Sequence, residues 1–204
     1  MFHRVTALAF CLSLLMVTLA DAQPIIHGPS SATGLGNYNL LPDKPGQTIS
    51  ILVKGGQAVQ GLNFNIQIAD GGPAAGGSIL GPSITAVDIL TGTIFAANNT
   101  GNPQGNGILV PQVAFYSTTT ASGSVAAQGL LASVTLDTTG FFAGTFDLIL
   151  SNTINSSTNF ASMNPALSPT IIDGSITLVP EPMSLMIVIG AGLMMQGRRS
   201  RRMN

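Results

Sequence analysis

The run at residues 61–69, "GLNFNIQIA", places the strongest constraint on the fold of this 204-residue chain. Apolar side chains occupy every second position of the run, and Asn or Gln fills the positions between them. A period of two puts all the apolar side chains on one face of a β-strand. The central part of the chain has no convincing helical period. The run therefore predicts a strand that buries one face against a second layer of structure.

Similar β-branched runs, separated by Gly, Pro, Asn and Ser, occupy most of the chain. The predicted strands are residues 48–54, 61–69, 84–90, 92–96, 108–117, 130–136, 145–150 and 175–179. Pro111 interrupts one of them, and because proline donates no ladder hydrogen bond, that run predicts an edge strand, a bulge or two separate strands. Many short strands joined by turn residues predict an all-β protein, an antiparallel β-sandwich or jelly roll.

Residues 1–22 have the organisation of a secretory signal peptide. A short basic head precedes an almost wholly apolar run at residues 5–19, and Ala20 and Ala22 supply the small side chains of a cleavage site before Gln23. We therefore expect a signal helix that signal peptidase removes, leaving Gln23 as the mature N-terminus. The alternative is an uncleaved membrane anchor.

The exported part of the chain is nearly free of charge and of cysteine. The one cysteine, Cys11, lies within the signal, so the mature protein has no disulfide and no thiol nucleophile. Residues 23–182 contain only two lysines and seven carboxylates. Nucleic-acid binding, which needs clustered cations to neutralise phosphates, is thereby excluded.

The same composition disfavours catalysis and metal binding. His27 is the only histidine after the signal, so acid–base chemistry would depend on aspartates. A glycosidase-like pair of Asp137 with Asp147 stays open, although both stand near turns or strand ends, where aspartate commonly bonds to the backbone. Asp70, Asp137 and Asp173 are candidate calcium ligands, but none stands in a D-x-D-x-D-G loop. We predict no catalytic site, no metal site and no cofactor.

Three segments of the body together resemble a cohesin-like domain. They are "KPGQTISILVKGGQAVQGLNFNIQIADGG", "GLLASVTLDTT" and "IIDGSITLV". The resemblance implies a jelly-roll sandwich over residues 37–179, related to some carbohydrate-binding modules. Residues 23–36 are predicted to form a flexible leader in front of it. No dockerin-like calcium loop accompanies these segments, and the resemblance supports the fold more than a function.

The C-terminal part, "VPEPMSLMIVIGAGLMMQGRRSRRMN", has three features in a fixed order. Pro180, Glu181 and Pro182 come first, and an uncharged stretch follows at residues 183–197. As a helix this stretch would be about 22 Å long, short of a hydrocarbon core of roughly 30 Å, and it predicts a single, marginal transmembrane helix. A basic cluster closes the chain and favours a cytoplasmic C-terminus: Arg198, Arg199, Arg201 and Arg202.

This order resembles the PEP-CTERM sorting signal of exported bacterial proteins. The resemblance identifies residues 180–204 as the signal and implies cleavage near the Pro-Glu-Pro motif by an exosortase. It also implies a precursor held transiently in the inner membrane and a product in the cell envelope, at the outer surface or in the extracellular matrix. The alternative is a plain transmembrane anchor.

Two non-catalytic functions fit the body. The first is a structural or adhesive surface module whose partners are other envelope proteins. The alternative is a carbohydrate-binding module that recognises extracellular polysaccharide. Sugar recognition usually uses exposed aromatic platforms, and the candidate residues are Tyr38, Tyr116, Phe141 and Phe142.

Overall fold

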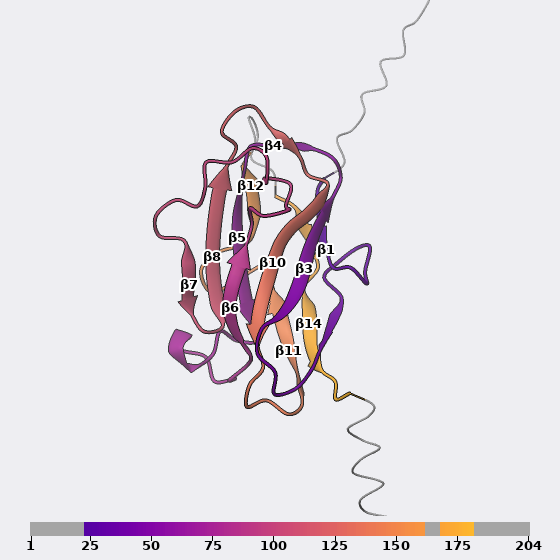
Figure 1. The fold of residues 1–204 in the computed structure, drawn as a ribbon, viewed down its shortest axis with the longest axis vertical. Helices are drawn as coiled ribbons and strands as arrows, with labels where there is room; N and C mark the ends of the chain where they lie inside the picture. Colours follow the sequence, from indigo (N-terminus) through magenta and orange to yellow (C-terminus); the bar gives the residue numbers. More distant parts are fainter. Residues whose placement is uncertain (1–22, 162–167, 182–204) are drawn as a thin grey trace, which may run out of the picture.

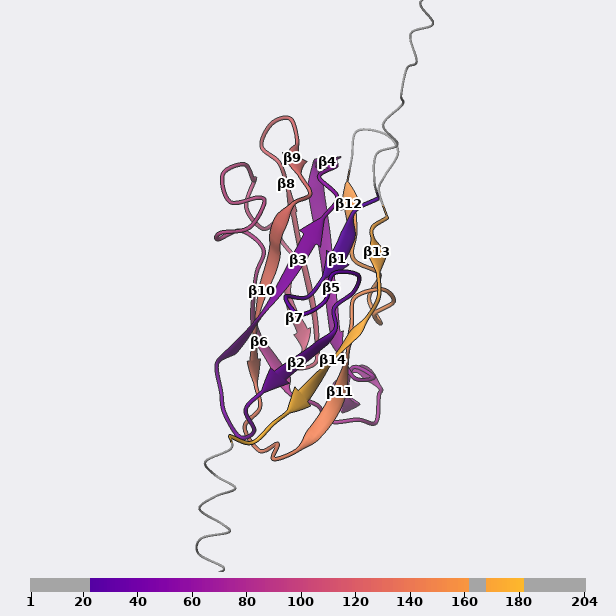
Figure 2. The ribbon, with the colours of Figure 1, turned by 90° about the vertical axis from the view of Figure 1, so that its right-hand side faces the viewer.

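In a computed structural model, residues 23–161 and 168–181 are described, and they form a sandwich of two β-sheets (Figures 1 and 2). Sheet A contains, in order, β13 (Thr170–Ile171), β1 (Ile25–His27), β3 (Gln47–Lys54), β10 (Gly129–Asp137) and β6 (Ser83–Asp88). Sheet B contains β2 (Asn37–Leu40), β14 (Gly174–Leu178), β11 (Gly144–Ile149), β5 (Gly61–Ile68), β8 (Val113–Thr119) and β7 (Gly107–Val110). The smaller elements are β12 (Asn159–Ala161), which pairs with β5, the β4 (Ala58–Val59) and β9 (Val125–Ala126) hairpin, and η1 (Pro73–Ala75).

The alternation in β5 has the predicted effect. Leu62, Phe64, Ile66 and Ile68 are at most 2% exposed and point into the space between the sheets. On the outer face Asn63 is exposed, but Asn65 and Gln67 are buried, because Asn155 and Ile154 of the loop after β11 hydrogen-bond to them. Inward side chains of β3 and β10, in sheet A, meet them across the sandwich and complete one hydrophobic core. The all-β sandwich predicted from the sequence is confirmed.

The first and last strands lie side by side and pass together from one sheet to the other. β1 pairs in parallel with β13 in sheet A, and β2 pairs in parallel with β14 in sheet B. Backbone hydrogen bonds continue across the passage, from Leu35 N to Ile172 O (2.9 Å) and from Ser175 N to Gly36 O (2.9 Å). A Cβ at Gly174 would stand 2.3 Å from Gly36 O, so only glycine fits at this crossing. These two pairs are parallel, whereas the sequence predicted an antiparallel sandwich.

Tyr38, on β2, joins the two sheets through its side chain. Its ring is 8% exposed, and its hydroxyl donates a hydrogen bond to Ser50 O of β3 at 2.8 Å. β1 ends at His27, which pairs with Leu52, so no strand covers that side of β3 at Ser50. The Tyr38 hydroxyl thus serves a backbone carbonyl that the strand pairing leaves open. Burial raises the pKa of the Tyr38 phenol.

Two predicted segments differ in the structure. Residues 23–36, predicted as a flexible leader, contain β1 and the fully buried Ile26 and Leu35, so they belong to the sandwich. Residues 92–96, predicted as a strand, form turns. There the Thr93 hydroxyl donates to Ile89 O at 2.7 Å and accepts from Phe95 N at 3.2 Å, and such local bonds compete with a strand ladder.

The interruption at Pro111 divides its run into two strands. β7 ends before the proline and β8 begins after it, and β7 lies at the edge of sheet B. This confirms one of the alternatives that the sequence left open, because a proline in a continuous central strand would remove a ladder hydrogen bond.

Several predicted features lie outside the described residues. These are the signal peptide with Ala20 and Ala22, Pro182, the uncharged stretch at residues 183–197, and the arginines at 198, 199, 201 and 202.

Within the described ranges, no helix has the length and apolar character needed to cross a membrane.

We predict that Tyr38→Phe lowers the free energy of unfolding by about 1 kcal/mol, because the Ser50 carbonyl loses its donor while the ring still fills the core. Urea unfolding followed by circular dichroism measures the change. Tyr116→Phe is the matched control, since the Tyr116 hydroxyl makes no hydrogen bond among the described residues, and it should change stability by less than about 0.5 kcal/mol. Equal effects of the two substitutions would contradict the role given to Tyr38.

The raised pKa of Tyr38 adds a pH dependence with a definite sign. A phenol whose pKa is higher in the folded state contributes stability below its unfolded pKa of about 10, and that stability is lost as the pH rises above it. The wild type should therefore lose more stability than Tyr38→Phe between neutral pH and about pH 11.

Candidate functional site

A groove lies at the end of the sandwich where β14 leaves the fold, the lower end in Figure 1. It has a volume of about 430 Å³. Three segments line it: the turn between β2 and β3, the turn between β10 and β11, and the residues that follow β14. The lining residues are Leu41, Pro42, Asp43, Lys44, Phe142, Pro180 and Glu181.

Thr138 and Gln47 fix the two turns to each other. Thr138 is fully buried, and its hydroxyl lies within donating distance of Leu41 O (2.8 Å) and Lys44 O (2.9 Å). The same oxygen accepts from Lys44 N at 3.0 Å and from Gln47 Nε2 at 3.0 Å. The Gln47 amide in turn accepts from Leu41 N at 2.7 Å and donates to Leu41 O at 2.8 Å. Side-chain groups thus satisfy the backbone of a turn that has no ladder partner, which makes the groove floor rigid.

The two adjacent phenylalanines of the β10–β11 turn lie in different environments. Phe141 packs against the core and meets Phe146 edge to face, with ring centroids 5.7 Å apart. Its carbonyl accepts from Asp43 N at 2.9 Å, which again ties one turn to the other. Phe142 points outward and is 69% exposed. One phenylalanine therefore anchors the turn while the next forms an apolar wall of the groove.

The Pro-Glu-Pro motif begins where the folded sheet stops. Val179 N donates to Leu40 O at 2.8 Å, and Pro180 follows directly. Pro180 and Glu181 are exposed, whereas Pro182 lies outside the described residues. One residue therefore separates the last β2–β14 hydrogen bond from the glutamate of the motif.

The groove carries one positive and two negative side chains. Lys44 stands with Asp43 and Glu181, which gives a net charge of −1 at neutral pH. Asp43 Oδ1 accepts from Gly140 N at 2.9 Å, so that carboxylate also joins the two turns. Asp43 has a φ of 48°, a left-handed conformation that Asp tolerates better than most residues.

Neither candidate tyrosine offers an open aromatic platform. Tyr38 lies in the core, as described above. Tyr116 stands opposite Phe64 in the β5–β8 pairing, so it faces inward, and it is partly buried against the core. Of the four aromatic residues considered from the sequence, Phe142 is the most exposed, and it lies in the groove.

The candidate carboxylates serve the backbone. Asp70 accepts hydrogen bonds from the N–H groups of Ser78 (2.6 Å), Ile79 (3.1 Å) and Gly72 (3.1 Å), and these bonds lower its pKa. Asp137 has a lowered pKa because the hydroxyl and the N–H of Thr139 donate to it. Each of these carboxylates closes a turn.

Asp173 and Asp147 do not form a catalytic or metal site either. Asp173 Oδ1 accepts from Leu150 N at 2.8 Å and Ser151 N at 3.0 Å. Asp147 is on β11 of sheet B, whereas Asp137 ends β10 of sheet A, so the fold does not bring these two aspartates together as a catalytic pair. Among residues 23–161 and 168–181, no group of three His, Cys, Asp or Glu side chains is placed to hold a metal ion.

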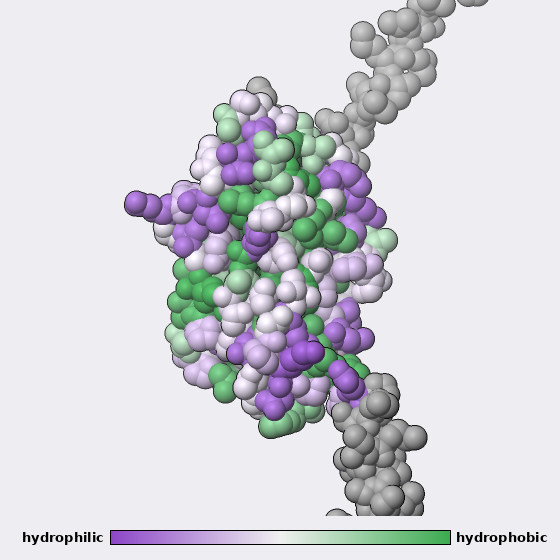
Figure 3. Space-filling view, viewed as in Figure 1, coloured by the Kyte–Doolittle hydropathy of each residue, from purple (hydrophilic) through white to green (hydrophobic). Residues whose placement is uncertain are grey.

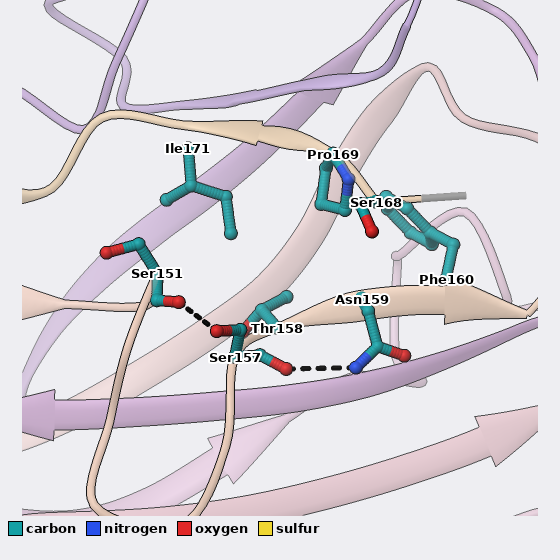
Figure 4. A pocket seen from close by; sticks show the side chains of 8 residues that line it. All are labelled: Ser151, Ser157, Thr158, Asn159, Phe160, Ser168, Pro169 and Ile171. Carbon is teal, nitrogen blue, oxygen red and sulfur yellow. Dashed lines mark hydrogen bonds between the residues drawn. The ribbon is translucent and has the colours of Figure 1, made fainter. Parts of the chain in front are cut away.

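A second cavity, of about 390 Å³, lies beside β12 (Figure 4). Its walls are Ser151, Ser157, Thr158, Asn159, Phe160, Ser168, Pro169 and Ile171. The polar groups in this cavity bond to the protein itself: Ser151 donates to Asp173, Ser157 to Ser151 O, and Asn159 Nδ2 to Ser157 O at 3.0 Å. This hydrogen bonding shapes the loop after β11 and leaves few groups for a ligand.

The outer faces of the sandwich are mostly neutral. Figure 3 views the sheet A side, where pale colours of intermediate hydropathy are mixed with green hydrophobic patches, and strongly hydrophilic residues gather near the edges and the lower end. On sheet B, Asn37 Oδ1 accepts from Ser175 Oγ and Thr177 Oγ1, both at 2.9 Å, and the Thr177 hydroxyl lies 3.2 Å from that of Thr145. Hydroxyl and amide groups make up most of this surface, and the exposed carboxylate of Asp147, the cross-strand partner of Ser175, lies on the same face.

Comparison with known proteins gives a likeness of fold only. No protein-family model and no curated protein matches the chain. Among solved structures, CaCohA2 from Clostridium acetobutylicum has a TM-score of 0.57 at 13% identity, covering 78% of this chain and 92% of that one. A non-cellulosomal cohesin from the archaeon Archaeoglobus fulgidus has a TM-score of 0.51 at 11% identity, covering 81% and 97%. The fold is a cohesin-like β-sandwich.

A third similar structure is a cohesin in a complex with a partner. The OlpC cohesin from Clostridium thermocellum, solved with a dockerin, has a TM-score of 0.53 at 10% identity and covers 79% of this chain and 96% of that one. The cohesin-like fold inferred from loose sequence motifs is thus confirmed.

Sequence reasoning did not find the groove. Its residues are separated by up to about 140 positions, and the β2–β14 pairing brings them together. β2, "NYNL", has too few apolar residues to be recognised as a strand. The sequence marks Phe142, Pro180 and Glu181 separately, but no sequence pattern indicates that these residues meet in one groove.

We predict that Thr138→Val costs about 2 kcal/mol of unfolding free energy, because a buried hydroxyl that serves Leu41, Lys44 and Gln47 is replaced by a methyl group of similar size. Denaturant unfolding measures the loss. Thr145→Val is the matched control, since that hydroxyl is exposed on the outer face of sheet B, and it should cost less than about 0.5 kcal/mol. A Thr138→Val protein as stable as the control would show that the turns are held in another way.

Proposed function

We propose that this protein is an exported, non-catalytic surface module that an exosortase processes at its C-terminus. The precursor is threaded outward, signal peptidase cuts before Gln23, and the C-terminal stretch holds the chain in the inner membrane. Cleavage near Pro180–Pro182 then delivers the sandwich to the envelope, the outer surface or the matrix. There it acts as a structural or adhesive component that contacts other envelope proteins.

The position of the Pro-Glu-Pro motif is the observation that carries this proposal. The described chain begins beside β1 near one end of the sandwich and leaves after β14 at the other end (Figures 1 and 2). Gln23, Pro180 and Glu181 are exposed, so neither processing point is buried in the fold. Prolines on both sides of Glu181 favour an extended backbone, which is the conformation that a protease binds. These positions support the proposal that both processing enzymes can reach the chain.

The chemistry of the body supports a non-catalytic role. Asp43, Asp70, Asp88, Asp137 and Asp173 accept backbone hydrogen bonds, and Asp147 lies on a different sheet from Asp137. The polar side chains in the second cavity hydrogen-bond to the protein itself. The outer face around Asn37 presents mainly hydroxyl and amide groups with the single carboxylate of Asp147, which suits contact with another polymer better than acid–base chemistry.

The partners of similar folds favour protein contacts over other ligands. The OlpC cohesin forms a complex with a dockerin, and a ScaB cohesin of R. flavefaciens, similar at a TM-score of 0.51 and 12% identity, is also solved with a dockerin. Those interactions belong to those proteins. Their likeness of fold supports the proposal that this sandwich, too, contacts other proteins.

Polysaccharide binding is the weaker candidate because the aromatic residues it would use are not displayed together. Tyr38 and Phe141 pack inside or against the core, and Tyr116 faces inward. Phe142 alone is well exposed. Binding of residues 23–181 to a defined polysaccharide, weakened by Phe142→Ala in a folded protein, would favour this alternative.

We predict that protein recovered from its native host starts at Gln23 and ends between Pro180 and Pro182. Glu181→Gln removes the one charge that marks the motif while keeping its shape, so uncut precursor that still carries Arg201 and Arg202 should become the main species. Intact-mass measurement with terminal sequencing separates the two forms.

Asp147→Asn is the matched control for that experiment, because it removes a carboxylate that is exposed on the body and distant in sequence from the motif. Its product should be cut as the wild type is. A wild-type protein that keeps its arginines in the host would contradict processing and leave a plain membrane anchor.

A further inference from the structure

The end of the sandwich that carries the groove has an apolar surface beside the exit of the chain. Phe142 is 69% exposed and Val179 is 43% exposed, and Leu41 and Pro42 lie in the same groove as Phe142. Thr138 and Gln47 hold the turns rigid beneath them. Phe142 and Val179 are two of eight large apolar side chains that are exposed in the described residues, and these two stand beside the exit of the chain.

The length of chain between this surface and the uncharged stretch is short. Glu181 is the last described residue, and Met183 begins the stretch. Two residues, even when fully extended, span at most about 7 Å. The headgroup layer on each side of a bilayer is roughly 5–7 Å thick, from the difference between total and hydrocarbon thickness. In an anchored precursor the groove must therefore lie at the depth of the headgroups or directly above them.

The uncharged stretch is short, and this brings the groove still closer to the membrane. As the helix of the proposed anchor, its 15 residues would be about 22 Å long, against a hydrocarbon core of roughly 30 Å. A span that is too short draws its flanking residues towards the membrane or thins the bilayer. On the outer side the flanking structure is the rigid end of the sandwich.

We propose that this end of the sandwich, with Phe142 at its tip, is a membrane-contacting surface of the precursor. The inference rests on the proposed C-terminal anchor. Phe142 and Val179 insert among the lipid headgroups on the outer side of the inner membrane, and the long axis of the sandwich then stands away from the bilayer. Aromatic side chains commonly occupy this interfacial layer. The surface holds the Pro-Glu-Pro motif at a fixed height above the hydrocarbon until cleavage releases it.

The charges of the groove indicate what kind of lipid contact this is. Lys44 is the only cation that lines it, against Asp43 and Glu181. A net charge of −1 gains nothing from anionic headgroups, so the contact is apolar and should not depend on the anionic lipid content. This separates it from the polybasic patches that bind acidic lipids.

Depth-dependent fluorescence quenching tests the inference in the chain from Gln23 to Asn204, which has no cysteine of its own. Phe142→Cys is labelled with nitrobenzoxadiazole, and the chain is reconstituted into phosphatidylethanolamine and phosphatidylglycerol vesicles that carry a lipid spin label near the headgroup. Ser122→Cys is the matched control, since it is exposed in the loop between β8 and β9 at the opposite end of the sandwich (Figure 2). Circular dichroism checks that both labelled proteins keep the β fold.

We expect a blue-shifted, quenched label at position 142 and an unshifted, unquenched label at position 122, with the same result when phosphatidylglycerol is omitted. Protein that floats with the vesicles but leaves the label at 142 unquenched would overturn this inference while the anchor stands. Equal quenching at both positions would also overturn it, because the sandwich would then lie on its side. Protein that does not float with the vesicles would overturn the anchor itself, and the membrane contact with it.

Discussion

The parallel pairing of the first and last strands is the constraint on which the rest of the structure depends. β1 with β13 and β2 with β14 cross together from sheet A to sheet B, and backbone bonds such as Leu35 N to Ile172 O continue through the crossing. This arrangement closes one side of the sandwich without a disulfide, which the mature chain has no cysteine to form. It also decides where the chain leaves. Because β14 is fixed along β2, the Pro-Glu-Pro motif emerges at one end of the fold beside the β2–β3 turn.

The few polar side chains of the body mainly satisfy hydrogen-bonding groups of its own backbone. Asp70, Asp137 and Asp173 satisfy backbone N–H groups at turns, and Thr138 and Gln47 do the same work at the groove. Buried polar groups that are fully bonded make a fold specific, whereas unbonded ones would be costly. Titratable groups committed in this way are poor catalysts. Phe142 and the motif beside it are exposed at the end where the chain leaves the fold, and the functional proposals concentrate at that end.

Local sequence could predict the strands whose apolar faces alternate, as in β5, and the division at Pro111. It could not predict β1, β2 or β13, because these short strands have little pattern of their own and the β1–β13 and β2–β14 pairs join residues more than 100 positions apart. The strand predicted at residues 92–96 was wrong for the opposite reason. Its apolar residues suit a strand, but the Thr93 hydroxyl bonds locally, and Phe95 is buried although it lies in a turn. The groove could not be predicted because the β2–β14 pairing assembles it from distant segments. The Pro-Glu-Pro motif can be recognised from the sequence, but the residues that surround it in the fold cannot.

The central claim is that the C-terminal strand belongs to the cooperative core and holds the motif in place. Native-state hydrogen exchange of residues 23–181 tests it at the amides of Ser175 and Val179, which bond to Gly36 O and Leu40 O of the N-terminal part of the chain. If the two chain ends fold as one unit with the sheets, these amides should exchange only through global unfolding, with the same opening free energy as the amides of β5. Exchange at Val179 and Ser175 that is orders of magnitude faster, while β5 stays protected, would contradict the account, because the motif would then hang from a frayed strand instead of the folded core.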